Sequence, residues 1–111
     1  MSDTVAIRRG DVVIAEVVSA GGRQIRKVRP YLVISPDVLN DLQFTFLVAP
    51  LTTGHHPYKY RVPCEMGGRR GHIVLDQLYT LDAAQAGPPI NQISATALRT
   101  ALAALREMFA E

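Results

Sequence analysis

Five short apolar segments, rich in β-branched and aromatic residues, follow one another up to residue 78 and restrict what this chain can fold into. Short runs of such residues, bounded by glycine or proline, are typical of strands in a small β-sheet. We expect the third segment to end at Pro50, because proline has no N–H to donate to a neighbouring strand. The segments span residues 12–18, 31–34, 44–49, 58–62 and 72–78. Together they predict a small, curled antiparallel sheet or barrel.

After residue 94 the periodicity changes from that of strands to that of a helix. Ser94 is suited to cap the N-terminus of a helix, and Pro88-Pro89 prevent an earlier start. Apolar side chains then recur every three or four residues and form one stripe, which consists of Leu98, Ala101, Leu102, Leu105, Met108 and Phe109. The pattern predicts a C-terminal helix packed on the sheet, and therefore a mainly β (α+β) fold.

Length and composition favour one folded domain over residues 1–111. The chain is 48% hydrophobic, which excludes a wholly disordered protein. No apolar run approaches the roughly 18–20 residues that cross a bilayer, and no signal-peptide core follows Met1. Cys64 is the only cysteine, which excludes an internal disulfide and a cysteine-built zinc site. We expect a cytoplasmic protein that does not contact a membrane.

The placement of charge is more informative than the net charge of +2. A basic cluster without an intervening acid consists of Arg23, Arg26, Lys27 and Arg29. Arg69-Arg70 form a second basic pair in a glycine-flanked turn. Such clusters attract phosphates, although a solvated loop carries similar charges. The pattern leaves phosphate binding and simple solvation equally open.

Several familiar site motifs are absent. Residues 67–71 lack the lysine and hydroxyl of a phosphate-binding P-loop, so we expect them to form a turn. His55 and His56 are adjacent and would point to opposite faces of a strand, which disfavours a shared metal ion. Cys64 has no activating partner nearby in the sequence and is expected to be a buried, inert thiol.

Several polar residues stand near the ends of the expected strands. Arg29 precedes Pro30 at the start of one strand, Thr52 and Thr53 follow another, and Asp76 interrupts an apolar strand. An arginine can hold a phosphate bidentately while a threonine hydroxyl donates a further hydrogen bond. In the structural alternative, Thr52 caps a turn, Asp76 pairs with an arginine and Arg29 is surface charge. The residues alone favour that alternative.

Four motifs occur in order along the chain, at residues 10–12, 29–36, 48–53 and 71–82. They read Gly-Asp-Val, Arg-Pro-Tyr-Leu-Val-Ile-Ser-Pro, Val-Ala-Pro-Leu-Thr-Thr and Gly-His-Ile-Val-Leu-Asp-Gln-Leu-Tyr-Thr-Leu-Asp. The series closely resembles the MazF/PemK (Kid) family of toxins from bacterial toxin–antitoxin pairs. That resemblance implies an SH3-like β-barrel with a C-terminal helix, a homodimer, and inhibition by a cognate antitoxin. It also implies a metal-independent, cofactor-free endoribonuclease that cleaves single-stranded RNA, messenger RNA above all, at short sequences.

The resemblance also implies roles for individual residues. Arg29 matches the catalytic arginine, Thr52 a catalytic-site hydroxyl, and Thr53 a second hydroxyl position that some members use. Asp76 matches an aspartate of the PemK branch with a catalytic or RNA-contacting role. Phosphoryl transfer by the RNA's own 2′-hydroxyl would need charge stabilisation by Arg29 and positioning by Thr52. As general base we expect Asp76 first and His56 second, since histidine titrates nearest neutrality.

Departures from the family pattern concern the expected contacts to RNA. Around Gln24 this chain lacks the acid that some relatives carry, so the basic loop is better suited to gripping the RNA backbone. Val74 stands where the PemK branch has an arginine, and Tyr79 stands where many relatives have one. Tyr79 could stack on an unpaired base or pack in the core. The expected RNA-contacting residues are Arg23, Arg26, Lys27, Gln77 and Tyr79.

Two other functions compete with RNA cleavage. One is a non-catalytic toxin similar to CcdB, which poisons DNA gyrase through a C-terminal Trp-Gly-Ile. This chain has no tryptophan and ends with residues 108–111, Met-Phe-Ala-Glu, which disfavours that reading. The other is a plain SH3-like binding module, against which only the combination of Arg29, Thr52 and Asp76 argues.

Overall fold

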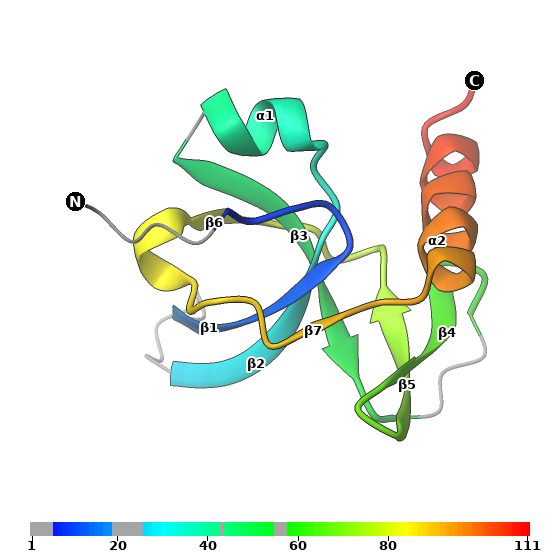
Figure 1. Cartoon of the computed structure of the whole chain (residues 1–111). Coiled ribbons are helices and arrows are strands. Elements are labelled where there is room, and N and C mark those ends of the chain that lie inside the picture. The colour runs from blue at the N-terminus through cyan, green and yellow to red at the C-terminus, as the bar shows by residue number, and fades with distance from the viewer. Residues whose placement is uncertain (1–5, 19–25, 43, 55–57) are drawn as a thin grey trace.

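The computed structural model describes residues 6–18, 26–42, 44–54 and 58–111, with the backbone alone at positions 18, 26 and 27 (Figure 1). The strands are β1 (Asp11–Val18), β2 (Arg26–Val33), β3 (Thr45–Thr52), β4 (Arg61–Met66), β5 (Arg69–Val74), β6 (Tyr79–Asp82) and β7 (Asn91–Gln92). The helices are α1 (Asp37–Leu42), the 3₁₀ helix η1 (Ala83–Gln85) and α2 (Ala95–Met108). The predicted mainly β fold with a C-terminal helix is confirmed.

All strand pairs are antiparallel, and the sheet order is β4-β5-β3-β2-β1-β7. β3 pairs with three other strands along its length. It pairs with β6 through residues 45–48, with β2 through 48–50, and with β5 through 51–52. This exchange of partners curls the sheet into a half-barrel, whose open side α2 covers beside β4 (Figure 1).

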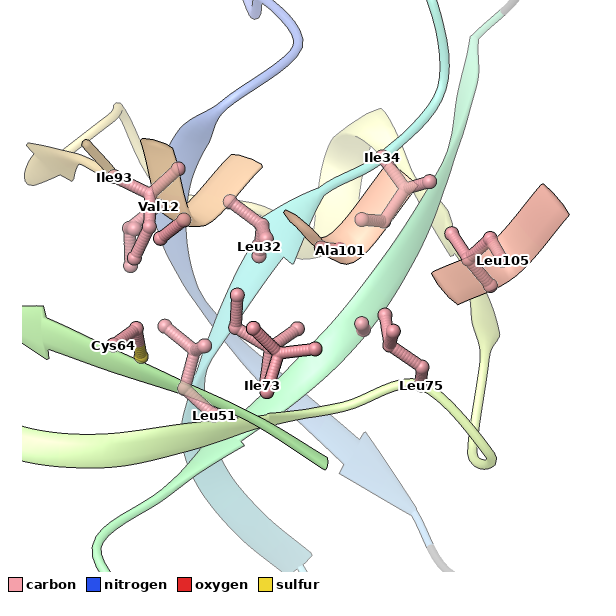
Figure 2. Packing of buried hydrophobic residues seen from close by; sticks show 13 residues of the cluster. Val12, Leu32, Ile34, Leu51, Cys64, Ile73, Leu75, Ile93, Ala101 and Leu105 are labelled. Atoms are coloured by element: carbon pink, nitrogen blue, oxygen red, sulfur yellow. The ribbon is translucent and has the colours of Figure 1, made fainter. Parts of the chain in front are cut away.

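The central strands are apolar without alternation because both of their faces are buried. Val12 and Leu32 face a cluster that also takes side chains from β3, β4, β5 and α2 (Figure 2). Val13 and Val33, their neighbours in the chain, face a second cluster with side chains of β3 and β6. Near-continuous apolar runs are the expected signature of strands covered on both sides.

The C-terminal helix starts where the sequence predicts. Ser94 accepts a hydrogen bond from Ala97 N at 3.1 Å, so it is the N-cap. The stripe is buried at Ala101 and Leu105 and partly buried at Leu98, Leu102 and Met108. Phe109 follows the last helical residue and is 73% exposed, so its assignment to the stripe is wrong. No helix in the described ranges is long and apolar enough to span a membrane.

Two strands extend beyond the predicted ends. β2 begins at Arg26 rather than at residue 31, because its pairing with β1 runs to Val18, and Arg29 therefore lies inside a strand. β3 continues through Pro50 to Thr52. β6 and β5 both pair with β3, β6 through residues 45–48 and β5 through residues 51–52, and Pro50 falls between these two parts. No described strand along that edge of β3 therefore needs the N–H that Pro50 lacks.

The two strands that follow are displaced from the predicted ranges of 58–62 and 72–78. Gly67 and Gly68 join β4 to β5 with φ values of 57° and 81°, as a two-residue hairpin loop requires. The expected turn is therefore these two residues, and Arg69 already pairs with Met66 in the hairpin. Asp76 lies in a turn beyond β5 and does not interrupt a strand.

Four elements were not predicted, namely α1, β6, η1 and β7. Each has six residues or fewer, which is too short to establish a periodicity. β6 and β7 exist because β3 and β1 offer them edges to pair with. Tertiary contacts, more than local preference, set these elements.

The first core cluster predicts the effect of truncating Leu32. Leu32→Ala should lower the free energy of unfolding by about 2–5 kcal/mol, because its side chain is completely buried among packed neighbours. Leu42→Ala is the matched control at a side chain 74% exposed, and should change it by less than about 0.5 kcal/mol. Urea unfolding of both variants measures the difference, and equal losses would contradict the assigned core.

Candidate active site

A cleft of about 360 Å³ opens where β3 leaves β2 and joins β5. Its walls come from β2, β3 and the hairpin of β4 and β5, three parts of the chain that are separated in the sequence. β2 supplies Arg29 and Pro30, β3 supplies Leu51 and Thr52, and Thr53 follows at the rim. The hairpin of β4 and β5, which lies beside the end of β3 in Figure 1, supplies the opposite wall.

Strand register brings Arg29 and Thr52 to the same place. β2 pairs with β3 so that Tyr31 opposes Pro50 and Leu32 opposes Ala49. The pairing ends at Tyr31 and Pro50, and residues just beyond it, Arg29 on β2 and Thr52 on β3, both line the cleft. Three of the predicted catalytic residues, Arg29, Thr52 and Thr53, therefore converge.

Thr52 is held in a defined orientation. Gly54 N–H donates a hydrogen bond of 3.3 Å to Thr52 Oγ1, so the turn-capping role of the structural alternative is present. Because the hydroxyl oxygen is the acceptor in this bond, its own proton stays available to a group in the cleft. His72 Nδ1 lies 2.8 Å from Gly54 O and donates to it, which ties the same turn to β5.

Arg29 presents a positive charge that no described carboxylate neutralises within ion-pair distance. The charge of Arg29 acts on Tyr31, two residues further along the strand. Burial and the neighbouring Tyr79 raise the pKa of Tyr31, and the charge of Arg29 only partly opposes this. Within the described residues the cleft thus holds an uncompensated guanidinium and a hydroxyl donor, the two kinds of group that bind a phosphate in proteins.

Gly71 sets how closely β5 approaches β3 at the cleft. A Cβ at this position would lie 2.4 Å from Thr52 O and 3.3 Å from Thr52 C, so a side chain cannot be accommodated without moving backbone. The cleft thus depends on a glycine in a strand, where glycine commonly marks the close approach of another backbone.

Cys64 lies at the floor of the cleft and is buried, as predicted. Burial raises the pKa of its thiol, since the thiolate would lose hydration. At neutral pH the group is therefore a protonated thiol and a poor nucleophile.

Asp76 is not among the residues that line the cleft. Its Oδ1 lies 3.6 Å from Nε of Arg61, a side chain only 16% exposed that also covers the ring of Tyr58. Arg61 Nε has no hydrogen-bond partner among the described residues, so this carboxylate is its main electrostatic compensation. The structural alternative, in which Asp76 pairs with an arginine, is the arrangement observed.

The residues that were expected to contact RNA lie in different parts of the structure. Gln77 is exposed beside the turn and Tyr79 opens β6, and neither lines the cleft. Tyr79 packs edge-on against Tyr31 at 6.0 Å between ring centroids and remains 39% exposed, so the packing role is the one seen. The backbone of Arg26 and Lys27 belongs to β2. The side chains of those two residues, and Arg23, His55 and His56, lie outside the described residues.

Arg69 and Arg70 line the cleft, and the sequence analysis did not include them among the site residues. The sequence indicated them as a basic pair in a turn that could bind phosphate or be solvated, and it did not connect them with Arg29 and Thr52. The signal that could have placed them is the alternation of Val62, Cys64 and Met66, which predicts a strand that pairs back across Gly67-Gly68. In the described ranges, no cluster of three or more His, Cys, Asp or Glu side chains could hold a metal ion.

A family model for the PemK-like, MazF-like toxins of type II toxin–antitoxin systems matches residues 8–109. The chain belongs to this family. An endoribonuclease MazF of Staphylococcus epidermidis is 33% identical over 82 residues, which cover 68% of this chain and 68% of that protein. The sequence resemblance to the family is thereby confirmed.

Solved structures of the MazF fold superpose on nearly the whole chain. A MazE–MazF complex of Deinococcus radiodurans gives a TM-score of 0.80 at 21% identity and covers 95% of this chain and 96% of that one. An endoribonuclease from a mycobacterial species gives 0.78 at 18% identity and covers 96% and 93%. At these identities the likeness establishes the fold.

The close approach at Gly71 predicts that even one added methyl group is harmful. Gly71→Ala should destabilise the toxin by about 1–3 kcal/mol, because its Cβ would overlap the backbone of Thr52. Gly87→Ala is the matched control, since a Cβ there would make an ordinary contact of 3.7 Å with Ile14 O. Chemical denaturation compares the two, and equal stabilities would refute the tight approach.

The pairing of Asp76 with Arg61 predicts a structural cost for its removal. Asp76→Asn should cost on the order of 1 kcal/mol, because it leaves a largely buried guanidinium less compensated, while the half-exposed carboxylate limits the loss. Asp41→Asn, at an exposed residue of α1, is the control and should leave the melting temperature unchanged. A melting temperature of Asp76→Asn equal to that of the parent would contradict the assignment.

Proposed function

We propose that this toxin is a metal-independent endoribonuclease that cleaves single-stranded RNA, with messenger RNA as the main target. One observation supports the proposal: Arg29 and Thr52, from separate strands, line the same cleft, where the guanidinium has no ion-pair partner among the described residues and the hydroxyl has a proton to donate. The relative from Staphylococcus epidermidis is named an endoribonuclease, which supports the reaction class.

In the proposed reaction the ribose 2′-hydroxyl gives its proton to water and its oxygen attacks the adjacent phosphorus, while the bond from phosphorus to the 5′-oxygen breaks and that oxygen takes a proton from water. The products carry a 2′,3′-cyclic phosphate and a 5′-hydroxyl. Arg29 binds the non-bridging oxygens and stabilises the negative charge that grows on them. Thr52 donates its hydroxyl proton to one of these oxygens and keeps the phosphate in line for attack.

Proton transfer is assigned to neither Arg29 nor Asp76. A guanidinium has a pKa above about 12 and is a poor base at neutral pH. Asp76 is engaged with Arg61 and lies outside the cleft lining. The chain's contribution is therefore charge stabilisation and positioning, and the loss of one such group typically costs about 100- to 1000-fold in rate.

The proposal extends to partners and location. Related solved structures include MazE–MazF of Deinococcus radiodurans and a mycobacterial endoribonuclease in complex with its cognate antitoxin. We infer that this toxin is likewise held inactive by an antitoxin protein. We further propose that it acts as a homodimer in the cytoplasm, as the family resemblance implies.

The reaction predicts that cleavage requires the 2′-hydroxyl and Arg29. In the presence of EDTA, the purified toxin should cut a mixed-sequence RNA and leave the all-deoxy oligonucleotide intact. Arg29→Ala should lower kcat by about 100-fold or more, because charge stabilisation is lost. Arg99→Ala, which removes an exposed arginine of α2, is the control. Cleavage of both substrates or of neither, or an unaffected Arg29 variant, would refute the proposal.

The structure at the end of β3 predicts different effects for the neighbouring hydroxyls of Thr52 and Thr53. Thr52→Ala should lower kcat by about 10- to 100-fold, since a hydrogen bond to a charged group is worth about 1.5–3 kcal/mol. Thr52→Ser should retain most activity because it keeps the donor. Thr53→Ala should have a smaller effect than Thr52→Ala, since Thr53 lies at the exposed rim. Single-turnover cleavage measures all three, and a larger loss for Thr53→Ala would reverse the assignment.

A further inference from the structure

Arg69 places a second positive charge in the cleft, on the wall opposite β2. It is the first residue of β5, and its side chain is exposed and lines the cleft that Arg29 and Thr52 also line. Among the described residues no carboxylate lies within ion-pair distance of it. The guanidinium is therefore free to bind an anion that enters the cleft.

The backbone that carries Arg69 is rigid. Arg69 pairs with Met66 directly across the two-glycine loop, whose positive φ angles suit a tight hairpin. The loop itself lies against β7, since a Cβ at Gly67 would be 3.6 Å from Asn91 Nδ2. A side chain that starts from a fixed position loses less freedom when it binds.

Arg69 and Arg70 both line the cleft, and an ion pair distinguishes them. Arg69 shares a face of β5 with Gly71, and its cross-strand partner Met66 also lines the cleft. Arg70 belongs to the opposite face, together with His72 and its cross-strand partner Thr52, and pairs across the hairpin with Glu65, with Nε 3.8 Å from Oε1. Of the two arginines, Arg69 is the one with no described carboxylate within ion-pair distance.

Position along the strand indicates which phosphate Arg69 would meet. His72 of β5 pairs with Thr52, and Arg69 precedes His72 by three residues. That spacing is about 10 Å along an extended strand. Arg69 therefore starts beyond Thr52 along the sheet, and its long side chain can reach a second phosphate of a strand that follows the cleft.

We propose that Arg69 forms a second phosphate-binding subsite, which holds the phosphate adjacent to the scissile phosphate of a single-stranded RNA. This inference rests on the proposed function for the meaning of the scissile phosphate. Arg69 is a positioning residue: it binds the RNA backbone equally before and during reaction, and so contributes to affinity more than to turnover.

The decisive experiment measures binding apart from cleavage. A fluorescent, fully 2′-O-methylated oligonucleotide, which cannot react, is titrated with the full-length toxin at a series of salt concentrations. Arg69→Gln should raise Kd about 5- to 20-fold at low salt and reduce the slope of log Kd against log salt by about 0.7, the value for one phosphate contact to a single strand. Arg99→Gln removes the same charge from an exposed position on α2 and should change neither quantity.

Cleavage kinetics on the unmodified RNA supply the second readout. Arg69→Gln should raise KM by a similar factor with kcat within about twofold of the parent, and Arg69→Lys should recover part of the affinity. An unchanged melting temperature shows that the exposed substitution leaves the fold intact. Loss of kcat with an unchanged Kd would overturn the positioning role.

The outcomes separate this inference from the function on which it rests. If Arg69→Gln and Arg99→Gln have the same Kd and salt slope, the subsite is refuted even when the parent cleaves RNA. If the parent binds the oligonucleotide but cuts no RNA, the proposed function fails. The change in the salt dependence of Kd on Arg69→Gln still tests whether Arg69 binds a phosphate. If the parent binds no RNA, both are refuted.

Discussion

The contact between the backbone of Thr52 and Gly71 is the constraint around which this toxin is built. It allows β3 to exchange its neighbours, from β2 and β6 along most of its length to β5 at its end. A Cβ at Gly71 would lie 2.4 Å from Thr52 O, so the exchange requires glycine. The cleft opens at this point because the pairing of β3 with β2 ends at Pro50, whereas its pairing with β5 covers Leu51 and Thr52. Arg29, Thr52 and Arg69 line the cleft together as a result.

The described arginines divide into those whose charge is balanced by a nearby carboxylate and those with no carboxylate within ion-pair distance. Arg61 is largely buried, covers a tyrosine ring and has Asp76 as its counter-charge, so it belongs to the scaffold. Arg29 and Arg69 have no described carboxylate within reach and both line the cleft. Free guanidinium groups repel one another and gain most from an anion between them, which supports the proposal that the cleft binds a polyanionic strand.

Sequence reasoning succeeded where the signal was local and failed where it depended on pairing. The β-branched run of β1 and the cap at Ser94 lie where they were predicted, since strand preference and capping act over a few residues. The start of β2 was missed because its charged first half has no apolar face, and only pairing with β1 makes it a strand. Asp76 was expected near Arg29 because a motif was matched, yet its position follows from the turn after β5.

Local chemistry in the amino-acid order was enough for the fold class, the C-terminal helix, the buried Cys64 and the identity of Arg29 and Thr52 as candidates. These conclusions need only the preferences of neighbouring residues or a match of short motifs. The convergence of Arg29, Thr52 and Arg69 came from strand pairing, and the position of Asp76 outside their cleft came from the turn after β5. Register is a cooperative property of hydrogen bonding between distant segments, and a shift of one residue would turn every side chain to the other face.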